Sequence, residues 1–162
     1  MAARDVIFAA VVLLAVGITG LVGHYALNSA VDEMMTNTVV ASSQPTLDTL
    51  GMARGISDRA DYLFLALFIG LTLGIMVTAW LVGGHPIWMI AFLVVIFVAV
   101  VLSAMLSNVW AEVATHVTLA PSVSSFSNTA HILGNLPWYI AGMGFMGLVV
   151  MFGKPFIMGD EY

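Results

Sequence analysis

Residues 87–107 read IWMIAFLVVIFVAVVLSAMLS and carry no charged side chain. Thirteen of these 21 residues are Leu, Ile, Val or Phe. A helix that crosses the roughly 30 Å hydrocarbon core of a bilayer needs about 20 mainly apolar residues, because lipid offers no partner for backbone N–H and C=O groups. The thirteen large apolar residues favour insertion by about 4–8 kcal/mol. The segment therefore predicts a transmembrane helix, which we place over residues 87–108.

Three further segments are long and apolar enough to cross a bilayer, and none of them carries a charged residue. They are residues 6–27, 62–82 and 136–152. The last segment is the weakest, because its large apolar residues favour insertion by only about 2–4 kcal/mol and its three glycines lower its helix propensity. The sequence thus predicts an all-α integral membrane protein in which four transmembrane helices form an antiparallel bundle, as a single domain over residues 1–162.

The composition excludes several classes of protein. Hydrophobic residues make up 61% of the 162 residues and charged residues only 8%, whereas a soluble domain has about 25% charged residues. A disordered chain would be poor in the large apolar residues that dominate here. The formal net charge of −5 leaves no basic surface for a phosphate backbone, so we expect no nucleic-acid partner. The absence of cysteine removes disulfides and iron–sulfur clusters.

Aromatic residues give an independent check on the four spans, because Trp and Tyr prefer the headgroup level of a membrane. They occur at the ends of the spans, where they alternate between the two sides, and we expect them at the membrane interface. These residues are Tyr25, Tyr62, Trp80, Trp88, Trp110, Trp138 and Tyr139. An even number of crossings places both termini on the same side of the membrane.

Two polar segments, residues 28–60 and 109–135, connect the spans on the side opposite the termini. The second has no Lys or Arg and is rich in Ser and Thr, as is typical of translocated segments. Because positively charged residues favour the cytoplasmic side, we expect both termini to be cytoplasmic, or inside the compartment that the membrane encloses.

Small residues recur at four-residue spacing in the first three spans, so that each span has a face over which another helix can approach closely. This spacing predicts packing within one bundle, with contact to another subunit as the alternative. The residues are Ala15, Thr19 and Gly23, then Gly70, Gly74 and Thr78, then Ala99, Ser103 and Ser107.

Four polar residues near one interface could in principle bind zinc or copper, since imidazole suits both metals. They are His24, Glu112, His116 and His131. Their spacing matches no metal-binding motif, and we interpret the histidines as interfacial side chains that bond to backbone or headgroups. The sequence predicts no metal and no cofactor.

Catalytic patterns are absent from the sequence. There is no Ser/His/Asp arrangement, no H-E-x-x-H pair and no paired carboxylate, and the G-x-G-x-x-G of residues 142–147 lies within an apolar span rather than after a strand. The spans also lack the charged residues that pumps and proton-coupled transporters place in the membrane. We therefore do not expect an enzyme.

These observations favour a non-catalytic membrane protein that acts as a structural or accessory subunit of a larger assembly. Such an assembly is a cellular complex or the membrane layer of a lipid-containing virion, and the expected partners are membrane lipid and other membrane subunits or copies of this chain. Two alternatives stay open. The first is a homo-oligomeric pore or holin-like permeabiliser lined by the Ser/Thr faces of the second and third spans, with Ser103, Ser107 and Asn108 as its characteristic stripe. The second is an accessory subunit of a membrane metal or redox enzyme.

Overall fold

The computed structural model describes residues 2–82 and 86–158, and all the secondary structure in these residues is helical. Four of the helices are long and apolar enough to cross a membrane, by length and composition. This confirms the prediction of an all-α chain with four such helices. The four helices are α1 (Ala2–Thr36), α4 (Ala60–Val82), α5 (Pro86–Thr115) and α8 (Leu136–Met158).

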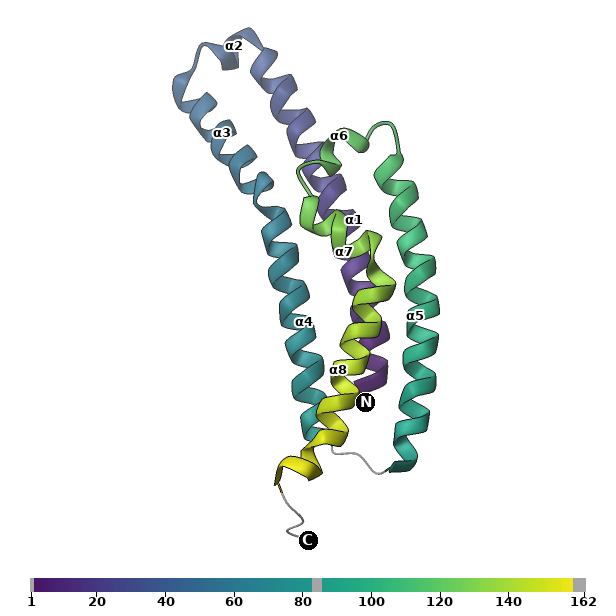
Figure 1. Ribbon diagram of the computed structural model, residues 1–162. Helices are drawn as coiled ribbons and strands as arrows, with labels where there is room; N and C mark the ends of the chain where they lie inside the picture. Colours follow the sequence, from purple (N-terminus) through teal and green to yellow (C-terminus); the bar gives the residue numbers. More distant parts are fainter. Residues whose placement is uncertain (1, 83–85, 159–162) are drawn as a thin grey trace.

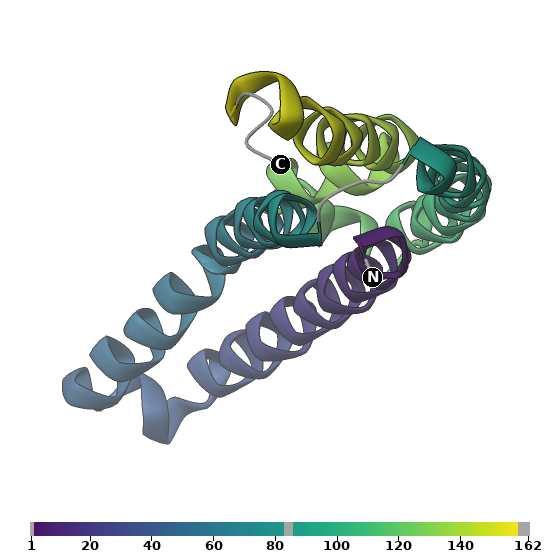
Figure 2. The same ribbon diagram turned by 90° about the horizontal axis from the view of Figure 1, so that it is seen from below.

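The four long helices lie side by side (Figure 1). Helices α1 and α8 each pack against both α4 and α5. Helices α6 and α7 lie at one end of this group, where α1 also continues toward α2, and α8 ends at the opposite end (Figure 1). Seen from below, α7 and α8 lie on one side of the α1–α4 pair and leave its other side uncovered (Figure 2).

The two polar segments that we expected to be loops are largely helical. Helix α1 does not stop near Leu27 but continues to Thr36, because residues 28–36 contain no glycine or proline to end it. Its 35 residues make it about 52 Å long at 1.5 Å per residue, well beyond the roughly 30 Å of a hydrocarbon core. The other helices of these segments are α2 (Thr38–Ala41), α3 (Gln44–Asp58), α6 (Ala120–Val123) and α7 (Ser127–Gly134).

Helices α3 and α4 follow each other almost without interruption. Proline 45 occupies the first turn of α3, where its missing N–H costs no hydrogen bond. Arg59 joins the two helices with helical backbone angles (φ −87°, ψ −4°). The end of α1 together with α2 and α3, residues 28–58, projects beyond the other helices (Figure 1), and we call this segment the projecting hairpin. None of the residues of α3 is buried.

The core lies where α1, α4, α5, α7 and α8 meet, and its side chains are almost all apolar. The fully buried large residues include Leu13, Leu21, Leu133, Leu136 and Ile140. Gly17 is required at one point of this core, because a Cβ there would overlap Leu133 of α7. Gly144 is required at another, because a Cβ there would lie 2.9 Å from Ile96 Cγ1.

Within one copy, the close approaches at Gly17 and Gly144 involve glycines that do not belong to the small residues singled out in the sequence. Ala15, Thr19 and Gly23 are exposed, and so are Gly70 and Gly74, while Thr78 is half-buried. Gly17 lies two residues, or about 200° around the helix, from Thr19. Gly17 therefore faces α7, whereas Thr19 faces away from it. On the third span, Ala99 and Ser103 are buried and Ser107 is half-buried.

The aromatic residues also divide into two groups. Tyr62 and Trp138 are exposed, Trp80 is 37% exposed, and Tyr25 and Tyr139 are half-buried. Trp110 is only 2% exposed and belongs to the core. Helices α6 and α7 fold back against α5, so that this end of α5 faces protein. The side chain of Trp88 lies outside the described residues.

Candidate functional site

The first of two polar clusters surrounds His24, at the level where α3 meets α4. The ring is buried, and its Nδ1 lies 2.9 Å from Ser57 Oγ in the last turns of α3. In the Nδ1–H tautomer of the ring, Nε2 accepts from the Asn28 amide at 2.9 Å and Nδ1 donates to Ser57. Asp58 Oδ1 is 3.9 Å from the same nitrogen. His24 thus ties α1 to the end of α3.

Two details complete this cluster. The ring of Phe126, just before α7, meets the His24 ring edge-on at 5.1 Å between centroids. On the other side of the imidazole, Asn28 Oδ1 is buried without a hydrogen-bond partner in the described part of the chain. A half-turn of the amide would bring this oxygen against Nε2 instead of the amide nitrogen, so the pair has two hydrogen-bonded arrangements.

The second cluster is built on Asp61, in the first turn of α4, which is 4% exposed. Its carboxylate accepts four hydrogen bonds from the first turn of α7. Oδ1 accepts from Thr129 N at 2.8 Å and Thr129 Oγ1 at 2.7 Å, and Oδ2 accepts from Asn128 N at 3.0 Å and Asn128 Nδ2 at 2.8 Å. The first N–H groups of a helix have no partner within it, and a negative charge there also interacts favourably with the helix dipole. Asp61 therefore caps α7 from a neighbouring helix.

Asp61 was not among the residues that the sequence pattern singled out. Two signals were present, an acidic residue directly before an apolar span and the polar triplet Ser127–Asn128–Thr129, which is typical of a helix start. The two lie 67 residues apart, and only the tertiary fold brings them together. Because all four lone-pair directions of the carboxylate are used by α7, the arrangement stabilises the fold and leaves no free base for a substrate.

The four residues considered for a metal site are not brought together. Glu112, His116 and His131 are exposed, whereas His24 is buried with protein partners. His116 Nδ1 accepts from Thr118 N at 3.4 Å, and the His131 ring packs edge-on against Tyr139. Over residues 2–82 and 86–158, no three His, Asp or Glu side chains are close enough to hold a metal ion.

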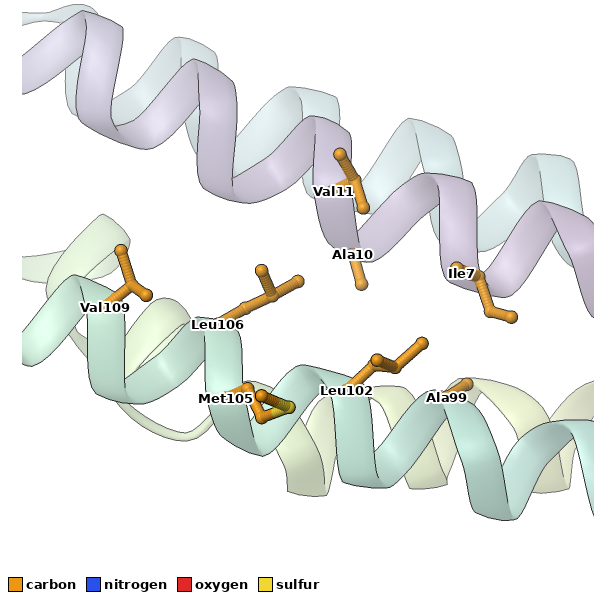
Figure 3. Close-up of a pocket in the computed structure, with 8 residues that line it drawn as sticks. All are labelled: Ile7, Ala10, Val11, Ala99, Leu102, Met105, Leu106 and Val109. Atoms are coloured by element: carbon orange, nitrogen blue, oxygen red, sulfur yellow. The ribbon is translucent and has the colours of Figure 1, made fainter.

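A groove between α1 and α5 is lined only by apolar side chains (Figure 3). Its volume is about 320 Å³. Leu102 and Leu106 of α5 point across it toward Ile7 and Ala10 of α1 (Figure 3). No polar group in it could orient or activate a substrate, and the lining fits a hydrocarbon chain.

A larger groove of about 600 Å³ lies on the uncovered side of the α1–α4 pair, and we call it the outer groove. Small residues of α1 form much of its floor, and a Cβ built on Gly23 would meet nothing within 4 Å. The His24 cluster closes one part of it. The residues that line the outer groove are Ala15, Val16, Thr19, Gly20, Gly23, His24, Leu27, Ser57 and Ala60.

Comparisons with known proteins add no further constraint. No protein-family model, no curated protein and no solved structure matches this chain. The features that bear on function are therefore the two polar clusters, the two grooves and the projecting hairpin.

Proposed function

We propose that this chain is an integral membrane protein whose four long helices form an antiparallel bundle across the bilayer, and that it serves as a non-catalytic component of a larger membrane assembly. The observation that carries the proposal is the projecting hairpin. It extends the chain well beyond the thickness of a hydrocarbon core, yet α3 contributes no buried residue.

Within the projecting hairpin Val31 of α1 is buried, whereas no residue of α3 is. Ile56 and Met34 are 71% and 51% exposed although both are large and apolar. Soluble surfaces seldom leave such residues contiguous unless another molecule covers them. The hairpin is therefore best understood as a surface that other protein subunits contact.

The polar groups near the bundle support a structural role. His24 and Asp61 bond to other helices of the same chain, and the hydroxyl of Thr72 donates to Phe68 O and to the sulfur of Met143. Apart from the bond of Thr72 to Phe68 O within α4, these contacts join different helices. Ser57 Oγ lies 2.9 Å from His24 Nδ1, but this ring is buried against Phe126 and its other nitrogen is bonded to Asn28.

The pore alternative is less favoured by the orientation of its proposed lining. Ser103 is fully buried within one copy and donates to Val100 O, and Ser107 donates to Gly134 O. A lumen between copies would need these hydroxyls to face outward. Liposomes that hold the protein at high density are expected to retain an entrapped dye, and leakage would favour the pore.

The accessory-subunit alternative depends on a metal near the histidines. Since Glu112, His116 and His131 point to solvent without converging, a stoichiometric metal would require a partner to supply ligands. Metal analysis of the purified protein distinguishes an accessory subunit of a metal enzyme from a metal-free component of an assembly. Stoichiometric zinc, copper or iron would favour the redox-enzyme alternative.

In the membrane we place both termini on one side, cytoplasmic or interior, and the projecting hairpin with α6 and α7 on the other. The experiment that tests the assembly is cross-linking in the native membrane, followed by extraction in mild detergent and analysis of what co-purifies. We expect the chain in a complex of defined stoichiometry. A monodisperse monomer with no cross-linked neighbour would refute the proposal.

A further inference from the structure

We infer that the groove between α1 and α5 binds one acyl chain of a membrane lipid, whose headgroup carries an ammonium group that lies beside Glu112. The inference goes beyond the proposed function, but it rests on one part of it, the placement of the four long helices across the bilayer. The groove is the one lined only by apolar side chains, and we call it the α1–α5 groove (Figure 3).

The α1–α5 groove has a closed floor and an open side. Ala10 and Ala99 line it and are only 2% and 1% exposed, so these two small side chains form its floor. Val11 and Leu102 also line it but are 51% and 41% exposed, so they form its walls. The open side therefore faces the surroundings of the bundle, which are lipid where α1 and α5 cross the bilayer.

The width of the groove decides between a hydrocarbon chain and another helix. From Ala99 to Val109 the groove follows α5 for about 15 Å at 1.5 Å per residue. Its volume of about 320 Å³ over this length gives a mean cross-section of about 20 Å². A helix about 10 Å wide needs about 80 Å², whereas a single row of methylene groups, with carbon contacts at about 4 Å, fits the groove. A hydrocarbon chain can therefore enter it and a helix cannot.

The depth of the groove corresponds to one leaflet of the bilayer. The uncharged segment of α5 starts near Ile87, and Ala99 lies about 18 Å further along the helix, just beyond the middle of a hydrocarbon core about 30 Å thick. Val109 directly follows the apolar segment. The groove thus extends from mid-bilayer to the interface on the side of the projecting hairpin. An acyl chain of that leaflet can run along it with its headgroup at the Val109 end.

The charge at the Val109 end favours one class of headgroup. Glu112 is exposed and lies seven residues, or two turns, after Met105. Because Met105 lines the groove, Glu112 lies on the edge of α5 that borders it. Apart from two histidines, Glu112 is the only ionisable residue between positions 109 and 135. Its carboxylate attracts an ammonium headgroup and repels an anionic one.

Native mass spectrometry of the full-length protein counts the lipids that it retains. The protein is reconstituted in nanodiscs with equal amounts of phosphatidylethanolamine and phosphatidylglycerol and then released from them. We expect one phospholipid for each chain. Leu102→Trp fills the groove with an indole ring and is expected to retain about tenfold less lipid, since the loss of about two buried methylene contacts gives this factor.

Ala104→Trp is the matched control. Ala104 is also exposed on α5, but it lies two residues, or about 200° around the helix, from Leu102. This variant should retain lipid as the natural protein does. Val11→Trp fills the groove from α1 and gives a second variant in case Leu102→Trp does not fold, which circular dichroism checks. Absence of retained lipid in the natural protein, or equal retention in a folded groove variant, would overturn the inference.

The headgroup is tested by the ratio of the two lipids that are retained. We expect phosphatidylethanolamine to be enriched about threefold in the natural protein, as the small energy of an exposed ion pair allows. Glu112→Gln removes the charge with little change in size and should bring the ratio close to that of the nanodisc. A ratio that this substitution leaves unchanged would overturn the assignment of the headgroup to Glu112.

Cysteine cross-linking detects a protein that covers the groove, because the natural chain has no cysteine. A disulfide between two copies of Leu102→Cys in the membrane, or its cross-link to another protein, would overturn the inference. The outcomes also separate the inference from the proposed function. Retained lipid in a chain without partner subunits refutes the assembly and supports the lipid site, whereas a complex whose chain retains no lipid does the reverse.

Discussion

At the scale of single residues, the chain places very few polar side chains inside and gives each a defined partner. Asp61 is the clearest case, since one carboxylate accepts two backbone and two side-chain hydrogen bonds from α7. A buried carboxylate is costly unless its charge is compensated by such bonds. Asp61 would destabilise an apolar bundle if its carboxylate had no partners, but its four bonds hold α7 in place.

Replacement of Asp61 by Ala is expected to lower the free energy of unfolding by about 2–4 kcal/mol, because it leaves buried donors of Asn128 and Thr129 without an acceptor. Chemical unfolding in detergent, followed by circular dichroism, measures the change. The control is Asp58→Ala, whose side chain is half-exposed and which should change stability by no more than about 0.5 kcal/mol. Equal effects of the two variants would contradict the capping role.

Glycine 17 offers a second test at this scale. Gly17→Ala is expected to destabilise the protein by about 1–3 kcal/mol, because the new methyl group overlaps Leu133 and has to displace it. Gly70→Ala on α4 is the matched control, since a Cβ there meets nothing within 4 Å and should stabilise the helix slightly. If both substitutions were neutral, α1 and α7 would not be in close contact.

At the scale of helices, the projecting hairpin is joined to the rest of the chain mainly at its base. The exposed Arg54–Asp32 pair contributes little, since surface ion pairs are worth about 0–1 kcal/mol. The His24 cluster is buried and contacts α3 and Phe126 as well as its own helix. The mobility of the hairpin should therefore depend on His24 more than on Arg54.

His24→Ala is expected to accelerate amide hydrogen exchange in residues 44–58 about tenfold, which corresponds to a loss of about 1.4 kcal/mol. Exchange in the buried part of α8 should stay unchanged. Arg54→Ala is the control and should alter exchange by less than about threefold. Acceleration that spread equally over the whole chain would mean that His24 supports the bundle rather than the hairpin.

The helices also show what this apolar sequence can and cannot predict. The four long apolar helices were predictable, because lipid requires each spanning segment to satisfy its own backbone and to be apolar along its whole length. Their ends were not, since α1 continues through Asp32 and Glu33 to Thr36, beyond the apolar segment itself. The contact of Asp61 with Thr129 joins residues 68 positions apart, and no local pattern contains it.

The faces of the helices were the hardest feature to predict. In a soluble protein an apolar face is the buried one, but a membrane helix is apolar on all sides, so that hydropathy does not distinguish the core from the lipid surface. The stripe of Ala15, Thr19 and Gly23 and the true contact at Gly17 differ by only two residues. Small residues at four-residue spacing thus indicated that a close contact exists without indicating its direction.

At the scale of the whole molecule, the helix order and the connections have a consequence for topology. If all four long helices cross the bilayer, α1 begins and α8 ends on one side, and the projecting hairpin lies on the other with α6 and α7 (Figure 1). We expect a membrane-impermeant maleimide to label Asp5→Cys and Thr38→Cys from opposite sides of sealed vesicles. Thr38 is exposed and Asp5 is half-buried, so Asp5→Cys should react more slowly, and detergent-opened vesicles give the reference rate for each. Labelling of both variants from the same side would mean that α1 does not cross the bilayer between positions 5 and 38.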